Sequence, residues 1–218
     1  MKLYYETVSK PLLECLQKLM ANSAFNDFVL VGGTALSLQL GHRISVDIDL
    51  FTANDYGSMN LKEIKDALSN TFSYFDGLEK LTERNLGYAV YVGNSQAEKI
   101  KLDLFYTEKF IAPIIQQDGL RLASLQDLAA MKIEAITNNK RKKDFWDIHE
   151  LLEYFTLEEM LQYGLQRNYQ TLNIDTAINS LYHSIEISQD SVITCLKGKY
   201  WELITDDLKT AAKQYRKK

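Results

Sequence analysis

The spacing of apolar residues changes near residue 119 and divides the chain into two parts. In the first part, short apolar or alternating runs predict β-strands, because alternate residues of a strand face opposite sides of a sheet. The predicted strands cover 28–31, 46–51, 88–92 and 100–106. Apolar residues three and four apart predict helices over 12–20 and 61–68. Gly93, Asn94 and Ser95 favour a hairpin between the last two strands.

The second part has an almost wholly helical pattern. Ser124 can cap a helix with Asp127 at its third position, so a helix is predicted to begin at Leu125. Further helices are predicted over 142–155, 157–165, 174–187 and 200–216. We therefore expect an N-terminal α/β domain over 1–118 and a C-terminal helical domain over 119–218.

The composition is that of a soluble globular protein. Of 218 residues, 46% are hydrophobic and 25% are charged, and only two are prolines. No apolar run reaches the roughly 18 residues that a membrane span needs. An acidic residue and a proline lie where a signal peptide has its apolar region. We expect a cytoplasmic protein without membrane contact.

Cysteine content and charge exclude some classes of protein. Cys15 and Cys195 are isolated, which predicts buried free thiols rather than a disulfide framework or a zinc site. The three histidines lack metal-ligand spacing. The net charge of −4 does not indicate a nucleic-acid-binding protein, although basic runs over 140–143 and 209–218 form local patches. The first run is either a solvated helix start or a surface that attracts RNA phosphates.

Two aspartates carry the strongest chemical signal in the chain. Asp47 and Asp49 are two apart in a predicted strand, so both side chains point to one face while residues 46, 48 and 50 face the core. Two adjacent carboxylates repel each other, and a bound cation would relieve that repulsion. Mg²⁺ is commonly held by one or two carboxylates together with water and phosphate oxygens. The alternative is a solvated strand face that happens to carry two aspartates.

Neighbouring residues favour the metal site. Gly32 and Gly33 end a predicted strand, Thr34 follows, and a helix begins at about residue 35, so this turn can bring backbone N–H groups close to a phosphate. Asp103 lies among apolar residues in a strand, where a carboxylate is disfavoured. If its strand lies beside 46–51, three carboxylates can serve two-metal nucleotidyl transfer, with Asp103 taking the proton of the attacking hydroxyl.

The glycine turn, the aspartate pair thirteen residues after Thr34 and the later aspartate resemble the signature of the polymerase-β-type nucleotidyltransferase superfamily. The stretch from Gly32 to Phe51, with Arg43 and Ser45 before the aspartate pair, is similar more narrowly to the AbiEii/AbiGii toxin family. The resemblance implies an α+β fold, in which a small mixed sheet with helices forms a polymerase-β-like core followed by a C-terminal helical bundle.

The second half extends this resemblance. Lys132 to Ala135 and the run from Lys143 to Ile148 resemble later motifs of the family. The resemblance implies that Lys132 contacts nucleotide phosphates and that Asp144 positions this lysine or supports the metal site. Without it, Lys132 would be a surface lysine and Asp144 an ordinary charge at a helix start.

The resemblance also implies nucleotide binding by the residues around the glycine turn, which are Gly32, Gly33, Thr34, Arg43 and Ser45. From its chemistry alone, the arginine could pair with Asp47 or with a phosphate, or could be solvated. The serine shares the strand face of the two aspartates by parity.

These expectations define a nucleotidyltransferase that uses Mg²⁺ or Mn²⁺ and moves a nucleoside monophosphate from an NTP to an acceptor hydroxyl. The resemblance implies a toxin of a bacterial toxin–antitoxin or phage-defence system, with tRNA or another RNA as acceptor and an antitoxin encoded nearby. Alternatives are transfer to a small molecule, as in antibiotic nucleotidyltransferases, transfer to a protein, or a non-catalytic nucleotide-binding module. A P-loop NTPase is disfavoured because no GxxxxGK[ST] is present. Residues 156–218 match no motif.

Overall fold

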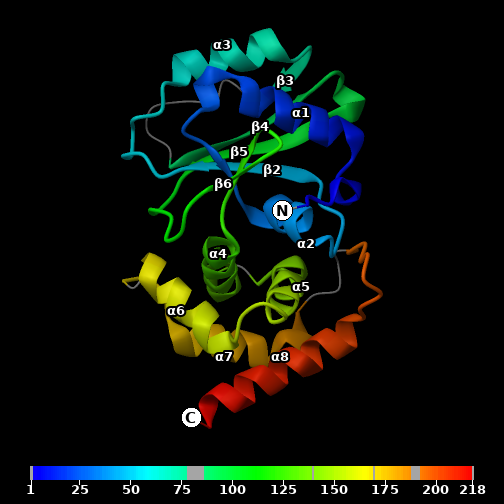
Figure 1. Cartoon of the computed structure of the whole chain (residues 1–218), viewed down its shortest axis with the longest axis vertical. Helices are drawn as coiled ribbons and strands as arrows, with labels where there is room; N and C mark the ends of the chain where they lie inside the picture. Colours follow the sequence, from blue (N-terminus) through cyan, green and yellow to red (C-terminus); the bar gives the residue numbers. More distant parts are fainter. Residues whose placement is uncertain (1, 78–85, 139, 169, 188–191, 218) are drawn as a thin grey trace.

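The computed structural model describes residues 2–77, 86–138, 140–168, 170–187 and 192–217. Figure 1 shows a sheet with its helices in the upper half and a group of helices in the lower half. The described strands are β1 Val29–Leu30, β2 Asp47–Thr52, β3 Tyr74–Asp76, β4 Gly87–Gly93, β5 Ile100–Tyr106, β6 Ile115–Gln117 and β7 Leu120–Leu122. The described α-helices are α1 Lys10–Ala21, α2 Gly32–Leu40, α3 Leu61–Thr71, α4 Leu125–Asn138, α5 Lys142–Leu151, α6 Leu157–Asn168, α7 Ile174–Tyr182 and α8 Trp201–Arg216.

The described strands form one mixed sheet in the order β3-β4-β5-β2-β1-β7-β6. At its centre, β2 runs parallel to β5 and antiparallel to β1. The pairing of β4 with β5 is antiparallel, which confirms the predicted hairpin. The α+β fold expected from the sequence is confirmed, and β2 and β5 are neighbours as the metal-site hypothesis required.

The β6–β7 hairpin was missed by the sequence interpretation. Asp118 and Gly119 form its turn with φ angles of 52° and 79°, and a two-residue turn with positive φ at both positions is typical of Asp-Gly. This dipeptide was an available signal, but strands of three residues show too little alternation to support it. Because β7 pairs with β1, the sheet continues past residue 119, and the helical half begins only at α4.

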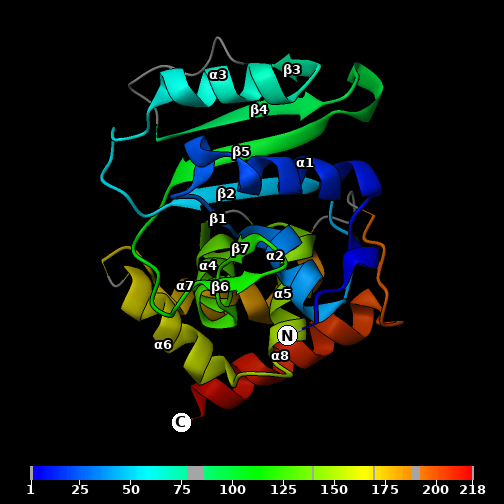
Figure 2. The same cartoon turned by 45° about the horizontal axis from the view of Figure 1, so that its top comes forward.

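Helices cover both faces of the sheet. Figure 2 shows α1 and α3 along one face, with α2, α4 and α5 on the other. Ile48 and Leu50 are fully buried, whereas Asp47, Asp49 and Phe51 of the same strand are only partly buried. The alternation of β2 therefore directs the aspartates towards the side where the helical half lies.

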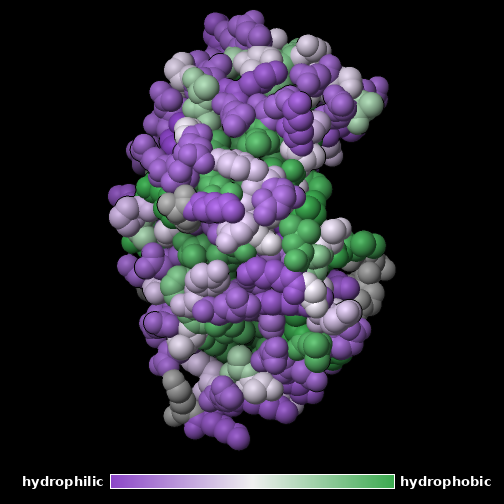
Figure 3. Space-filling view, turned by 45° about the vertical axis from the view of Figure 1, so that its right-hand side comes forward, coloured by the Kyte–Doolittle hydropathy of each residue, from purple (hydrophilic) through white to green (hydrophobic). Residues whose placement is uncertain are grey.

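Val46 does not face the core as expected. It precedes β2 and is 66% exposed. Ser45 forms a bridge with Val8, and Arg43 forms one with Cys195, so this stretch lies between two other chain segments and does not continue the alternation of β2. With the right-hand side of Figure 1 turned forward, Figure 3 shows apolar surface at about mid-height of the molecule.

The helical half is organised around α4, which contacts α5, α6 and α7. Asp127 N–H donates to Ser124 Oγ, which confirms the predicted cap. Phe145 and Trp146 are buried, and Trp146 stacks on Trp201 with ring centroids 6.2 Å apart. A single cluster of buried apolar side chains runs from the sheet into these helices.

Two further sequence expectations concern the cysteines and the membrane. Cys15 and Cys195 are both free thiols, and Cys195 is only partly buried. Among the described residues, no helix is long and apolar enough to cross a membrane.

Candidate active site

Three carboxylates lie on two adjacent strands, and we call Asp47, Asp49 and Asp103 the carboxylate face. Asp49 is the register partner of Asp103, so the predicted proximity of these two is confirmed. Asp47 lies opposite Lys101 in the same register. Lysines neutralise part of the charge, because Lys101 Nζ pairs with Asp103 and Lys143 Nζ lies 3.6 Å from Asp47 Oδ2.

The Asp49–Asp103 pair carries charge that its surroundings do not fully balance. Burial and the charge of Asp103 together raise the pKa of Asp49 to about 6, although Lys132 and Lys143 act in the opposite direction. Oδ1 of Asp103 is buried and has no hydrogen-bond partner among the described residues. Both features favour the approach of a cation or a proton donor.

Gly32 brings the first turn of α2 against the carboxylate face. A Cβ at this position would lie 2.2 Å from Oδ2 of Asp49, and φ is +68°, so any side chain here would both clash and strain the backbone. Gly32 is itself the first residue of α2, one turn earlier than the sequence indicated. The helix N-terminus, with its free N–H groups, therefore lies beside Asp49.

Gly33, Thr34 and Ser45 lie behind this surface rather than on it. A Cβ on Gly33 would lie 2.4 Å from an Arg43 nitrogen, so this glycine makes room for the arginine. The Thr34 hydroxyl donates to the carbonyl oxygen of Asp47 and lies 2.8 Å from Ser45 Oγ, with both side chains buried. Their contacts anchor the start of β2, and their hydroxyls are already engaged.

Arg43, Lys132, Asp144 and Asp147 form a second charged cluster, which we call the buried ion network. Lys132 Nζ lies 2.5 Å from Asp144 Oδ1 and 2.7 Å from Asp147 Oδ2. Arg43 donates to both oxygens of Asp147, at 2.6 and 2.8 Å. This network joins the segment after α2 to α4 and α5 across the two halves.

The charge of Asp147 is fully balanced. Burial alone would raise its pKa, but the charges of Arg43 and Lys132 and the hydrogen bonds from His42 and Arg43 hold the pKa well below its usual value. His42 Nε2 lies 2.8 Å from Asp147 Oδ1, so this histidine is a structural residue. A buried pair satisfied in this way stabilises the fold only while every partner is present.

Two sequence expectations change here. Arg43 pairs with neither Asp47 nor solvent, because it is 4% exposed and bound to Asp147. Lys132 is a buried residue rather than a surface lysine, and its pairing with Asp144 agrees with the positioning that the resemblance implied. Asp147 received no role from the sequence, although its spacing of three from Asp144 on a predicted helix placed both on one side.

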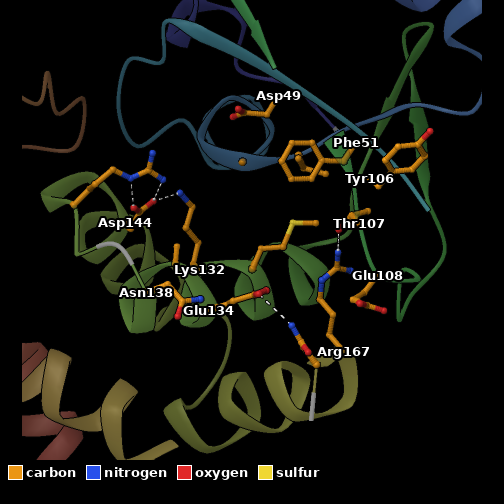
Figure 4. A pocket seen from close by; sticks show the side chains of 16 residues that line it. Asp49, Phe51, Tyr106, Thr107, Glu108, Lys132, Glu134, Asn138, Asp144 and Arg167 are labelled. Atoms are coloured by element: carbon orange, nitrogen blue, oxygen red, sulfur yellow. Dashed lines mark hydrogen bonds and ion pairs between the residues drawn. The ribbon is translucent and has the colours of Figure 1, made fainter. Parts of the chain in front are cut away.

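A cavity of about 430 Å³ opens between the carboxylate face and the helical half. Figure 4 shows Asp49 above it, Lys132 and Asp144 on one side, and Phe51, Tyr106, Thr107 and Arg167 on the other. The lining residues come from the start of α2, the ends of β2 and β5, and helices α4, α5 and α6. They are Val31, Gly32, Asp49, Phe51, Tyr106, Thr107, Glu108, Met131, Lys132, Glu134, Ala135, Asn138, Arg141, Asp144, Arg167 and Asn168.

Several of these cavity residues were missed by sequence reasoning. Arg167 and Asn168 lie in the segment that matched no motif, and only the folding of α6 against α4 brings them to the cavity. Glu134 and Asn138 share the helical spacing of Met131, which gave a weak signal for a common face. Of the predicted site residues, Gly32, Asp49, Lys132 and Asp144 line the cavity.

The fit of a metal ion to this site rests on Asp49 and Asp103. Within the described part of the chain, no three His, Cys, Asp or Glu side chains converge on one point, so the predicted three-carboxylate cluster is not assembled. Asp47 pairs with Lys143 instead. The adjacent pair offers oxygen donors alone, one of them without a partner, and this donor set suits Mg²⁺ or Mn²⁺.

The sheet is mixed and carries paired carboxylates that face a cavity and the start of α2 at Gly32. This arrangement defines the polymerase-β-like nucleotidyltransferase class. Residues 14–194 match the family described as "Nucleotidyl transferase AbiEii toxin, Type IV TA system", and the chain belongs to this family. It is accordingly a nucleotidyltransferase of a toxin–antitoxin family.

Other proteins are similar to this chain over most of its length. The chain is 27% identical over 212 residues to an uncharacterized protein of Aquifex aeolicus (strain VF5), covering 93% of this chain and 94% of that protein. The fold is similar to JHP933 from Helicobacter pylori, with a TM-score of 0.56 at 19% identity, over 96% and 94% of the two chains. It is also similar to MenT4, a nucleotidyltransferase toxin from Mycobacterium tuberculosis H37Rv, with a TM-score of 0.53 at 14% identity, over 93% and 83%.

Proposed function

We propose that this toxin-family enzyme transfers a nucleoside monophosphate from an NTP to a hydroxyl of an RNA acceptor, such as tRNA, with Mg²⁺ or Mn²⁺ as cofactor. The observation that carries the proposal is the adjacent Asp49–Asp103 pair, whose charge is incompletely balanced; Asp49 lies beside the N-terminus of α2 and lines the wall of a cavity. An enzyme that uses NTP and RNA would act in the cytoplasm.

Asp49 and Asp103 would hold the metal ion, and Asp47 would join them once released from Lys143. When bound, the ion neutralises charge on the phosphates and on the carboxylate pair. Gly32 at the start of α2 offers backbone N–H groups to a phosphate at the same place. Removing negative charge from Asp49 should therefore prevent metal binding without disturbing the fold.

The chain's own residues can carry out the remaining steps. Lys132 and Arg141 line the cavity and are suited to bind the triphosphate. Oδ1 of Asp103, which lacks a partner among the described residues, is suited to accept the proton of the acceptor hydroxyl. The acceptor oxygen then bonds to the α-phosphorus, the bond from the α-phosphorus to the bridging oxygen breaks, and pyrophosphate leaves.

An RNA acceptor is supported by the basic run 140–143. Arg141 lines the cavity, and Lys143 reaches Asp47 at the carboxylate face, so both cations lie where an acceptor strand would enter. The family description as a type IV toxin–antitoxin system supports a cognate antitoxin, encoded nearby, as partner. Transfer to a small molecule or a protein would use the same carboxylates and is tested in the same experiment.

The test incubates the protein with Mg²⁺, each of the four α-³²P-labelled NTPs and total RNA, and compares wild type with Asp49→Asn. We expect label on RNA with wild type and none with the variant. Asp175→Asn is a matched control, because Asp175 lies in the first turn of α7, outside the residues that line the cavity. If label appeared only on protein or only on small molecules, that class of molecule would be the acceptor instead of RNA. No transfer with any NTP would contradict the proposal.

A further inference from the structure

The cavity extends well beyond the residues that handle phosphate. One side of the cavity carries the groups suited to a metal-bound triphosphate. They are the charged side chains of Asp49, Lys132 and Arg141 and the backbone N–H groups at Gly32. Figure 4 shows Phe51 and Tyr106 on the opposite side, with Arg167 farther from Asp49. An NTP with its phosphates at Asp49 would extend its base towards this side.

A flat apolar wall lies at the right place for a base. Phe51 is two residues after Asp49 on the same strand face, which corresponds to about 7 Å along β2. Phe51 is supported by Phe105 of β5, with ring centroids 5.6 Å apart, and Tyr106 follows on β5, where its hydroxyl accepts a hydrogen bond of 2.7 Å from the N–H of Met59. Rigid aromatic surfaces of this kind stack on bases without discriminating between them.

The floor opposite this wall comes from α4 and carries two polar side chains, those of Glu134 and Asn138. Met131, Glu134, Ala135 and Asn138 are spaced by three and four residues, so one side of the helix faces the cavity. In Figure 4 the Glu134 carboxylate lies between the phosphate side and the aromatic side. A base stacked on the aromatic wall would bring its edge to this carboxylate.

Glu134 is held in one orientation by Asn168 of α6. Nδ2 of Asn168 donates to Oε1 of Glu134 at 3.1 Å. Among the described residues, neither Oε2 of Glu134 nor Oδ1 of Asn168 accepts a hydrogen bond. The pair therefore presents two acceptor oxygens to the cavity.

The neighbouring Arg167 fixes the end of α6 that carries Asn168. Its guanidinium lies 3.2 Å from Asp127 Oδ1 and donates to the carbonyl oxygen of Lys109 at 3.3 Å. It also donates to the Thr107 hydroxyl. Arg167 is thus a positioning residue that ties α6 to the segment after β5, and the acceptor pair is built on a rigid support.

We propose that Glu134 and Asn168 select the base of the NTP and favour bases with an exocyclic amino group over uracil. An amino group donates to a carboxylate or amide oxygen, as cytosine N4 does to glutamate. Uracil presents carbonyl oxygens on either side of its single N–H, and these repel two acceptors. The inference rests on the proposed function, because it assumes that an NTP occupies this cavity.

The test measures binding of ATP, GTP, CTP and UTP by calorimetry, with Mg²⁺ and without acceptor, to wild type and to Glu134→Gln. We expect wild type to bind UTP more weakly than its best nucleotide. The glutamine keeps the size of the side chain but adds an N–H donor, so the preference should fall at least tenfold. Asn168→Ala should reduce the same preference while leaving UTP affinity nearly unchanged.

Glu108→Gln is the matched control, because Glu108 lines the same cavity and undergoes the same chemical change. Its selectivity should equal that of wild type, and unchanged thermal unfolding should confirm that each variant is folded. Wild type that prefers UTP, or a preference that persists in Glu134→Gln, overturns the inference while leaving nucleotidyl transfer intact. Selective binding without transfer to any acceptor contradicts the proposed function alone, and no binding of any NTP contradicts both.

Discussion

The carboxylate face and the buried ion network both concentrate aspartates, but they balance charge in opposite ways. On the carboxylate face, burial and the charge of Asp103 raise the pKa of Asp49 to about 6. In the network, Arg43 and Lys132 outweigh the effect of burial and hold the pKa of Asp147 well below its usual value. Ionisation of Asp49 therefore destabilises the folded protein, whereas ionisation of Asp147 stabilises it.

This difference indicates what each cluster does. A pair of carboxylates that repel each other is held together by the fold and is relieved by a cation. A carboxylate with several buried cationic partners holds the elements that carry those partners together, here α4 and α5 with the segment after α2. We infer that the carboxylate face serves chemistry, whereas the network holds the two halves together and positions Lys132 at the wall of the cavity.

The largest expected effect separates activity from stability. Asp49→Asn should reduce transfer by about 1,000-fold or more, because the metal contribution to charge stabilisation is worth several kcal/mol. The unfolding free energy should stay the same or rise, since one member of a repelling pair is removed. Rate measurements and chemical denaturation of the same preparation check both parts. A variant that is inactive because it is unfolded would contradict the division of roles.

The network should show the reverse pattern. Asp147→Asn leaves Arg43 and Lys132 with less buried negative charge and should lower the unfolding free energy by about 3–5 kcal/mol. Urea denaturation at low temperature measures the loss. Activity per folded molecule should fall much less than in Asp49→Asn. An unfolding free energy equal to that of wild type would show that the network does not hold the two halves together.

The third effect is the pH dependence of stability in the metal-free protein. Because the folded pKa of Asp49 is raised to about 6, the folded state binds more protons, and stability should fall by about 1–3 kcal/mol as pH rises from about 4 to about 6. The lowered pKa of Asp147 has the opposite sign, so its contribution is present above about pH 4 and is lost as pH falls. Denaturation midpoints against pH should lose the first change in Asp49→Asn and keep the second.

The smallest effect concerns the exposed pair at the edge of the carboxylate face. Lys143 lies 3.6 Å from Asp47 with both side chains partly exposed, and such pairs contribute roughly 0–1 kcal/mol. Lys143→Ala should therefore change the unfolding free energy by less than about 1 kcal/mol. A larger loss of unfolding free energy, measured by the same denaturation, would show that Lys143 stabilises the fold as the members of the buried ion network do.

The sequence predicted the carboxylate face better than the network because strand alternation is a local property. A period of two assigns Asp47 and Asp49 to one face without knowledge of the rest of the fold. The pairing of Asp103 with Asp49 needed only that two strands be neighbours, and the register confirms it. Each of the three carboxylates can contact another carboxylate or a nearby lysine. Which partner it contacts depends on side-chain packing, and the spacing of residues in the sequence does not reveal it.

The link between Arg43 and Asp147 could not be predicted because these two residues are 104 positions apart in the sequence. Arg43 and Asp147 meet only when α5 packs behind α2, and no local pattern carries that information. The same reason hid Arg167 and Asn168, whose segment matched no motif. The missed strand β7 had a different cause, since three residues are too few to show a period.

Calorimetric titration of the metal-free protein with Mn²⁺ at pH 7.5 tests the central claim most directly, with wild type, Asp49→Asn and Asp147→Asn compared at a temperature where all three are folded. The account predicts that wild type and Asp147→Asn bind the ion and that Asp49→Asn does not. Equal binding by wild type and Asp49→Asn, or no binding by wild type, would contradict the assignment of the carboxylate face as the metal site.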